Sequence, residues 1–382
     1  MKLTLNTETL TEALRPVGRH VPTRPDSPAA AGLRLTATED TLCLIAAGDP
    51  ATSAGTALPA SVHEVGTAVL PGRMLHGLAR TLPAGQPLDI TVDERFAHLQ
   101  FGGTRISIPI LNTDEYPRQP DLPKAVGTVA GKVLAAAVHQ IAVAAGADDT
   151  LPMLTGIRVE LVGNTLKLTA TDRYRLAIRQ IPIQRTVRRA PAARCVIPAK
   201  ALRATVSDFR RAESVTVGLP AAEGQRFSLS TGALTVTHRP LDAKHYPDID
   251  KVVPTSFATQ VVLERAALIE ALTRAVAVAR DYVPVNLAVQ PGGPVVITGG
   301  SRDEGRTREE LTARSAKGEP IRISFSPGFL LAGLRVLKSR SVQLDLTTEH
   351  RPAVLHSPGV DRAELRYLLM PVRTASDAPA PN

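Results

Sequence analysis

Basic side chains recur at helical spacing in three separate parts of this 382-residue chain. Each group follows a proline, at Pro71, Pro198 and Pro327. In chain order, the basic residues are Arg73, His76, Arg80, Lys200, Arg203, Arg335 and Lys338. Residues three and four apart share one face of a helix, so each segment predicts a helix with a basic face. Such a face can contact phosphates, although an ordinary solvated helix face has the same spacing.

Residues with the chemistry of an enzyme active site form no recognisable motif in this sequence. Gly127–Lys132 is one residue short of a phosphate-binding Walker A loop, and Val133 stands where Ser or Thr would hold magnesium. Its simplest interpretation is the junction of a strand and a helix. The paired Asp148 and Asp149 are typical of a cap or turn. We therefore expect no catalytic residue, metal site or cofactor, and a nucleotide-dependent enzyme that uses Lys132 is the alternative from a different class.

The elements that carry the basic groups repeat three times. A short apolar strand, a proline and an amphipathic helix occur around Pro71, Pro198 and Pro327, at spacings of 127 and 129 residues. The first two copies also close alike, with Tyr-Pro at Tyr116 and Tyr246. Periods this long indicate duplicated domains, because solenoid repeats span about 20–50 residues. The sequence predicts three similar domains and a disordered tail, at residues 1–122, 123–252, 253–373 and 374–382.

Charge and composition narrow the class of protein. The net charge is +9, and residues 123–252 carry 19 basic and 10 acidic side chains, which favours a polyanionic partner. Aromatic residues make up 3% of the chain and Trp is absent, so any contact with DNA should be to phosphates, without base reading. The sequence shows no signal peptide, membrane span or CxxC motif, and we expect a cytoplasmic protein.

Two segments carry a specific family resemblance. They are TATDRYRLAIR, at Thr169–Arg179, and the C-terminal YLLMPVR, at Tyr367–Arg373. Together they resemble the bacterial DNA sliding clamp, the beta subunit of DNA polymerase III, in a form close to its actinobacterial branch. The resemblance covers residues 1 to about 373. It implies an α+β fold of three repeated DNA-clamp domains, each with antiparallel sheets outside and two helices on one face, and a head-to-tail dimeric ring.

The resemblance also implies a function and its sites. A non-catalytic processivity factor would encircle duplex DNA without sequence specificity and bind the polymerase catalytic subunit and the clamp loader through short linear peptides. The implied peptide-binding pocket consists of Leu154, Thr171, Arg173, Tyr174, Arg175, Leu176, Pro247, Val252, Phe329, Met370, Pro371, Val372 and Arg373. The implied DNA-facing residues are Arg24, Arg73, Arg80, Lys200, Arg203, Arg335 and Lys338. The implied interface of the homodimer contains Ala277 and Val278.

Some features depart from the pattern of the family. Ala277 and Val278 are small for the core of an interface, Gly48–Ala60 replaces an acidic segment, and the chain is basic where clamps are usually acidic. These departures leave open a specialised clamp-like paralogue, in repair or inhibitor resistance, with weak ring closure. A basic DNA-binding monomer is a further alternative.

Overall fold

The computed structural model describes residues 1–119, 121–186, 193–279, 283–301, 305–359 and 364–373. The expected tail at 374–382 lies outside the described residues. The chain forms two compact units. Unit 1 comprises residues 1–132, 183–195 and 207–240, and unit 2 comprises residues 133–182, 196–206 and 241–382.

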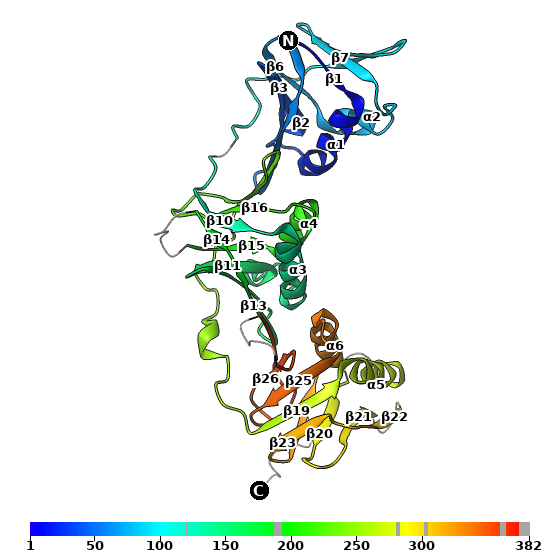
Figure 1. Cartoon of the computed structure of the whole chain (residues 1–382), viewed down its shortest axis with the longest axis vertical. Coiled ribbons are helices and arrows are strands. Elements are labelled where there is room, and N and C mark those ends of the chain that lie inside the picture. The colour runs from blue at the N-terminus through cyan, green and yellow to red at the C-terminus, as the bar shows by residue number, and fades with distance from the viewer. Residues whose placement is uncertain (120, 187–192, 280–282, 302–304, 360–363, 374–382) are drawn as a thin grey trace. The chain divides into compact units, whose positions relative to one another are not determined.

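One order of elements occurs three times along the chain (Figure 1). The first copy has β1 (Lys2–Asn6), α1 (Thr7–Val17), β2 (Gly32–Thr38), β3 (Thr41–Ala46), β4 (Thr52–Pro59), β5 (Ser61–Glu64), β6 (Gly66–Pro71), α2 (Gly72–Ala79), β7 (Pro87–Val92), β8 (Phe96–Phe101) and β9 (Thr104–Pro109). The second has β10 (Ala125–Val129), α3 (Gly131–Ile141), β11 (Gly156–Val162), β12 (Thr165–Thr171), β13 (Arg175–Pro182), β14 (Gln184–Arg185), β15 (Arg194–Pro198), α4 (Ala199–Phe209), β16 (Val215–Gly218), β17 (Phe227–Ser230) and β18 (Leu234–His238). The third has β19 (Thr259–Glu264), α5 (Arg265–Val278), β20 (Val285–Val289), β21 (Val295–Ser301), β22 (Gly305–Leu311), β23 (Ser315–Gly318), β24 (Ile321–Phe325), α6 (Pro327–Val336), β25 (Ser341–Leu346), β26 (Ala353–His356) and β27 (Leu365–Leu369). The predicted threefold α+β repeat is confirmed.

The helices predicted after the three prolines are α2, α4 and α6. Pro71 and Pro198 end the strands before α2 and α4, whereas Pro327 begins α6, where its fixed φ angle suits a first helical residue. One detail of the prediction is wrong: Lys338 does not lie on α6. The helix ends at Val336 because Leu337 adopts an extended backbone (φ −68°, ψ 140°) and buries its side chain.

In unit 1 the strands form two antiparallel sheets, in the orders β5-β1-β7-β8-β9 and β14-β10-β16-β17-β18-β4-β3-β2-β6. The larger sheet joins the first two copies, since β18 pairs with β4 from Leu234 opposite Thr56 to His238 opposite Thr52. The buried hydroxyls of Ser53 and Thr237 lie 2.7 Å apart across this pair.

In unit 2 the sheet orders are β15-β11-β12-β13-β27-β26-β25-β19-β23 and β22-β21-β20-β24. Here β13 of the second copy pairs with β27 of the third, from Arg175 opposite Leu369 to Arg179 opposite Leu365. This pairing brings together the two segments that carried the family resemblance, which are nearly 200 residues apart in the sequence.

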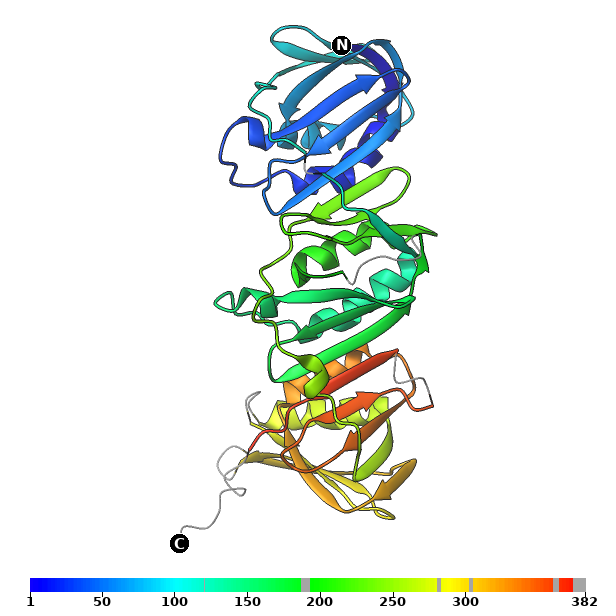
Figure 2. The same ribbon diagram turned by 90° about the vertical axis from the view of Figure 1, so that its left-hand side faces the viewer.

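In each copy the helices cover one face of the sheets, and the opposite face exposes the strands (Figures 1 and 2). The helices bury a single apolar stripe, as amphipathic surface helices do. The stripe includes Leu75 and Ala79 on α2, Leu202 and Val206 on α4, and Leu330 and Leu334 on α6. The remaining faces are free to carry charged side chains.

The segment that resembled a Walker A loop joins β10 to α3, as we predicted. Gly131 begins α3, and its backbone N–H donates to the carbonyl of Ala212 at 3.0 Å. A Cβ at Gly131 would collide with the backbone carbonyl of Phe209, which ends α4. The glycine is therefore required for close packing of backbone on backbone.

Two histidines in unit 1, the buried His238 and the half-buried His20, should make stability depend on pH. Burial lowers the pKa of His20 and of His238 to about 4 each. Between pH 6.5 and 4 the unfolded chain therefore binds more protons at these positions than the folded chain, so the free energy of unfolding falls as the pH falls. We expect a loss of about 2 kcal/mol over this window from His238, measured by urea denaturation at a series of pH values.

His238→Asn should remove that part of the pH dependence. The matched control is His350→Asn, because His350 is exposed in unit 2. Equal slopes of stability against pH in the wild-type chain and in His238→Asn would contradict the assignment.

Candidate functional site

The segment TDRYR forms a tight turn between β12 and β13. The Asp172 carboxylate accepts the backbone N–H groups of Tyr174 and Arg175, both at 3.0 Å, and the Arg175 Nε at 2.8 Å. The Thr171 hydroxyl donates to the Arg175 carbonyl at 2.7 Å and accepts the Arg173 N–H at 3.1 Å. Arg173 has a φ of 80°, which is uncommon for a residue with a side chain. These bonds hold the turn in that conformation and present Tyr174 outward.

Beside this turn lies a pocket of about 210 Å³ in unit 2. We call it the turn pocket. Its lining is Thr171, Arg173, Tyr174, Arg175, Leu176, Pro247, Ile249, Val252, Pro352, Leu368 and Met370. Eight of these residues are among the thirteen that the sequence analysis assigned to a peptide pocket. The lining is mainly apolar with a few polar groups, as is usual where a ligand buries apolar side chains.

The remaining five predicted pocket residues lie outside this lining. Leu154 is buried, and Phe329 packs beside the pocket, with its ring 6.3 Å from that of Tyr174. Pro371 and Val372 are half-buried and Arg373 is exposed, beyond the end of β27. The backbone N–H of Val372 donates to the Ser324 carbonyl at 2.8 Å, which fixes the course of this segment.

The sequence analysis missed Ile249, Pro352 and Leu368 in the lining. Ile249 and Leu368 belong to a buried cluster with Leu176, and this cluster forms the apolar floor of the turn pocket. Ile249 lies two residues after Pro247, which the resemblance assigned to the pocket, so its closeness to Pro247 in the sequence was the available signal. Pro352 had no such signal. It lies just before β26, outside the segments that carried the family resemblance.

Contacts with α6 and with the residue after β27 orient the groups at the rim of the turn pocket. The Arg175 guanidinium lies 4.4 Å from the centroid of the Phe329 ring, while its Nε donates to Asp172. The Met370 N–H donates to the Tyr174 carbonyl at 2.8 Å. Tyr367 is buried, which raises its pKa to about 12, and its hydroxyl donates to the Phe329 carbonyl at 2.9 Å. The aromatic and cationic groups at the rim are thus fixed before any ligand binds.

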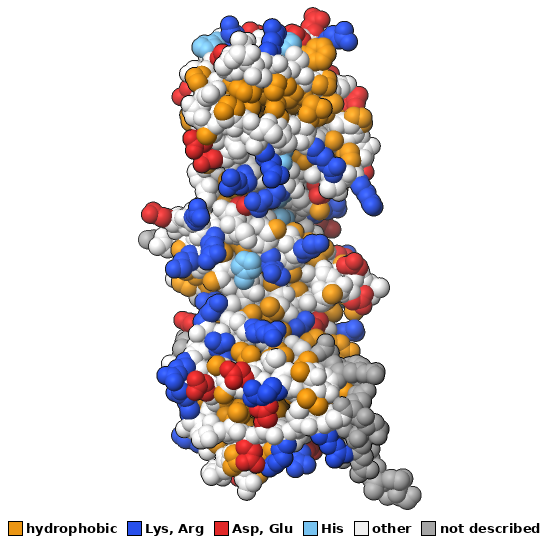
Figure 3. Space-filling model, turned by 90° about the vertical axis from the view of Figure 1, so that its right-hand side faces the viewer, with side chains coloured by type: hydrophobic (Ala, Val, Ile, Leu, Met, Phe, Trp, Pro, Cys, Tyr) orange, Lys and Arg blue, Asp and Glu red, His pale blue; other side chains and the backbone are white. Residues whose placement is uncertain are grey.

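The predicted DNA-facing residues are all exposed. Arg73 and Arg203 lie on α2 and α4, Arg335 lies on α6, and Arg80 caps the C-terminal end of α2. Figure 3 shows Lys and Arg side chains spread over the helix-bearing face of each unit. The interpretation of these helices as basic surfaces therefore agrees with the geometry.

A basic pocket of about 430 Å³ lies between α1 and α2 in unit 1. Its lining includes Arg15, Arg19, His76 and Arg80. Arg19 also forms an ion pair of 2.8 Å with Asp208. The sequence analysis missed Arg15 and Arg19, which lie on either side of the C-terminal end of α1, in its last turn and in the short 3-10 turn that follows.

The predicted dimer-interface residues are exposed at the C-terminal end of α5. Val278 has 44% of its surface exposed, and Ala277 is exposed beside it. One turn earlier, Arg274 donates to the two carboxylate oxygens of Glu309 at 2.8 and 2.6 Å. This bidentate pair holds the end of α5 against β22.

The described residues show neither a metal-binding cluster, nor a reactive thiol at Cys195, nor a membrane-spanning helix. Within them, no cluster of three His, Cys, Asp or Glu side chains could hold a metal ion. Burial raises the pKa of the Cys195 thiol to about 12, which suppresses its thiolate. No helix in the described part of the chain is both long and apolar enough to cross a membrane.

Comparisons with known proteins agree with this geometry. Sequence profiles of the DNA polymerase III beta subunit match in three consecutive parts: the N-terminal domain at residues 1–120, the central domain at 128–248 and the C-terminal domain at 250–373. The beta sliding clamp of Streptomyces coelicolor is 37% identical over 98% of this chain and 99% of its own length. The beta sliding clamp homolog GriR of Streptomyces muensis is 35% identical over the same shares. The crystal structure of the Bacillus subtilis clamp covers 98% of this chain and 99% of its own with a TM-score of 0.88, and at 24% identity it shows the shared fold. The chain belongs to the DNA polymerase III beta subunit family, the bacterial beta sliding clamps.

Proposed function

We propose that this protein is a non-catalytic processivity factor of bacterial DNA replication. As a clamp of the polymerase III family it holds the polymerase on DNA, without reading sequence. The observation that carries this proposal is the turn pocket, whose apolar floor and fixed aromatic rim suit the apolar anchors of a short peptide. The polymerase catalytic subunit and the clamp loader are the partners that would dock there.

The ring is the second part of the proposal. Two chains would join head to tail in a homodimer, with Ala277 and Val278 in the interface, and place the basic helix faces around duplex DNA in the cytoplasm. The three domains would have the predicted boundaries at residues 122/123 and 252/253. Contacts between these basic faces and phosphates give an affinity that depends on salt but not on sequence, which suits a ring that slides.

A specialised clamp paralogue with weak ring closure is the second candidate. It is favoured by the 35% identity to the GriR homolog and by the small side chain of Ala277 at the expected interface. Sedimentation from nanomolar to micromolar concentration separates the candidates, since a working ring should remain a dimer of about 81 kDa, twice the 40.5 kDa chain. A monomer that persists at micromolar concentration would support the paralogue.

Retention on DNA tests the ring directly. Loaded by a bacterial clamp loader, the protein should remain on nicked circular DNA at least about tenfold longer than on linear DNA, because a ring slides off free ends but not off a circle. The measurement is gel filtration of labelled protein on both DNAs, with linearisation of the circle as the control. Equal lifetimes would indicate a basic DNA-binding monomer and overturn the proposal.

A further inference from the structure

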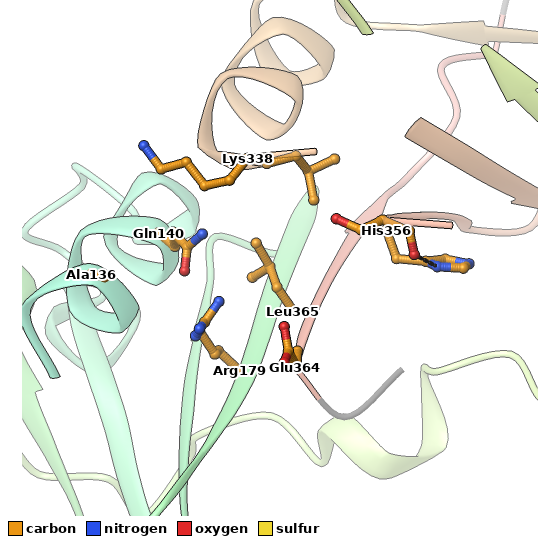
Figure 4. Close-up of a pocket in the computed structure, with 9 residues that line it drawn as sticks. Ala136, Gln140, Arg179, Lys338, His356, Glu364 and Leu365 are labelled. Carbon is orange, nitrogen blue, oxygen red and sulfur yellow. Dashed lines mark hydrogen bonds between the residues drawn. The ribbon is translucent and has the colours of Figure 1, made fainter. Parts of the chain in front are cut away.

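A second pocket in unit 2 shares no lining residue with the turn pocket. It is bordered by α3, β13, the start of β27 and the segment after α6, and we call it the junction pocket (Figure 4). Its volume is about 220 Å³. One water molecule needs only about 10–15 Å³, so the junction pocket has room for a small organic ligand.

Two polar atoms at the junction pocket are buried without a partner. Gln140 is only 6% exposed, and its amide Nε2 donates to the Val336 carbonyl at 2.9 Å, but its Oε1 accepts no hydrogen bond. The Nε of Arg179 is likewise buried and unpaired. Buried polar atoms are usually hydrogen-bonded, so these two unpaired atoms indicate that a ligand or ordered water occupies the pocket.

The side chains converge from different elements. Figure 4 shows Gln140 reaching in from α3 and Arg179 from β13, while the His356 ring points away. That ring is already engaged, with Nε2 3.0 Å from Asp345 Oδ2 and Nδ1 3.0 Å from the Ser357 carbonyl. Gln140 and Arg179 therefore offer an acceptor and a donor to the same space.

The charge at the junction pocket favours an anion. Arg179 and Lys338 are cationic and Glu364 is anionic, which leaves one positive charge in excess. Burial lowers the pKa of Arg179, and the charge of Glu364 offsets this shift only in part. An anionic ligand would compensate the half-buried guanidinium, whose Nε is fully buried, further.

The unpaired Oε1 of Gln140 restricts which anions fit. An amide oxygen only accepts hydrogen bonds, so the ligand must also carry a hydrogen-bond donor. A DNA phosphodiester has no hydrogen to donate and its deoxyribose has no free hydroxyl within the strand. Hydrogen phosphate and sugar phosphates carry both an anionic phosphate and a hydroxyl. We propose that the junction pocket binds a hydroxyl-bearing phosphate, with its anionic oxygens on Arg179 and Lys338 and its hydroxyl donating to Gln140 Oε1.

Calorimetric titration of the full chain with two probes, inorganic phosphate and ribose 5-phosphate, tests this proposal. Stronger binding of ribose 5-phosphate identifies a sugar phosphate as the ligand, and equal binding identifies hydrogen phosphate alone. Lys338→Gln and Gln140→Met should each weaken the better probe by at least about tenfold. Lys338 is exposed, so its replacement leaves the fold intact. Lys317→Gln is the matched control, since Lys317 is an exposed lysine of unit 2 outside the junction pocket and should leave the affinity unchanged.

Two results would overturn the proposal. One is no binding of either probe up to about 10 mM, which would mean that the junction pocket holds only water. The other is binding that Lys338→Gln and Gln140→Met leave unchanged, which would place the phosphate elsewhere. Retention on circular DNA, measured on Gln140→Met, reports the clamp function separately, because Gln140 lines the junction pocket and is not one of the DNA-facing residues. Failure of one proposal is therefore distinguishable from failure of the other.

Discussion

Replacement of Tyr174 by alanine should weaken the binding of a clamp-binding peptide from the polymerase catalytic subunit by about 30-fold. Tyr174 has 59% of its surface exposed, lines the turn pocket and packs against Phe329. Its backbone is already fixed by the Asp172 carboxylate, so the ring needs little further ordering on binding. Truncation of a central aromatic residue at an interface costs about 2 kcal/mol or more, which corresponds to this change in Kd. The measurement is fluorescence anisotropy of the labelled peptide, titrated with the full chain.

A second variant and a control make this test specific. Met370→Ala should also weaken binding of the peptide, because Met370 lines the turn pocket next to Tyr174, whose carbonyl accepts the Met370 N–H. Val162→Ala should have no effect, since Val162 is 46% exposed at the end of β11 and is outside the lining. Wild-type affinity in both pocket variants would mean that the peptide binds elsewhere.

The turn at residues 171–175 could be predicted from the sequence, because hydrogen bonds between residues close in sequence determine its structure. Asp172 bonds to groups two and three residues ahead of it, and Thr171 bonds to groups two and four residues ahead. Such short-range bonds make a turn recognisable as a motif, because the same few residues produce it wherever they occur. The same reasoning explains why the helices after Pro71, Pro198 and Pro327 were predicted correctly.

The missed lining residues depend on contacts that are distant in sequence. Leu368 and Pro352 reach the turn pocket because β13 pairs with β27 and β27 pairs with β26. A single sequence contains no signal for strand pairing between separate repeats, since alternation describes only which face a residue occupies. The pairing of β18 with β4 was missed for the same reason.

The error at Lys338 has a different origin. Its spacing of three from Arg335 suggested a continuous helix face. In the structure the buried Leu337 turns the chain out of the helix and toward β25, so tertiary burial overrides the local pattern. The same change of direction places Lys338 at the junction pocket.

Replacement of Asp345 by alanine should cost about 3–5 kcal/mol of unfolding free energy, as is typical when one partner of a buried ionic group is removed. Asp345 is fully buried on β25 and accepts hydrogen bonds from Gln260 at 3.0 Å and Gln343 at 2.7 Å. Its second oxygen lies 3.0 Å from Nε2 of His356, whose Nδ1 faces the Ser357 carbonyl. Both ring nitrogens of His356 therefore face oxygens, and the carboxylate, the two glutamine amides and the ring form one hydrogen-bonded network. Urea denaturation, monitored by hydrogen exchange of the β25 amides, measures the loss.

The expected loss of unfolding free energy in Asp345→Ala comes from hydrogen-bond donors that lose their acceptor. The control is therefore a carboxylate whose donor water can reach. Asp345→Ala leaves the side chains of Gln260 and His356 without their acceptor in the interior, where water cannot replace it. Asp250→Ala removes an exposed carboxylate, 3.1 Å from the half-buried Lys167, and should cost at most about 1 kcal/mol because water replaces its contacts. Asp345→Asn keeps an acceptor of the same shape and should fall between the two. If Asp345→Ala costs no more than Asp250→Ala, the carboxylate does not organise β19, β25 and β26, and their stability rests on apolar packing alone.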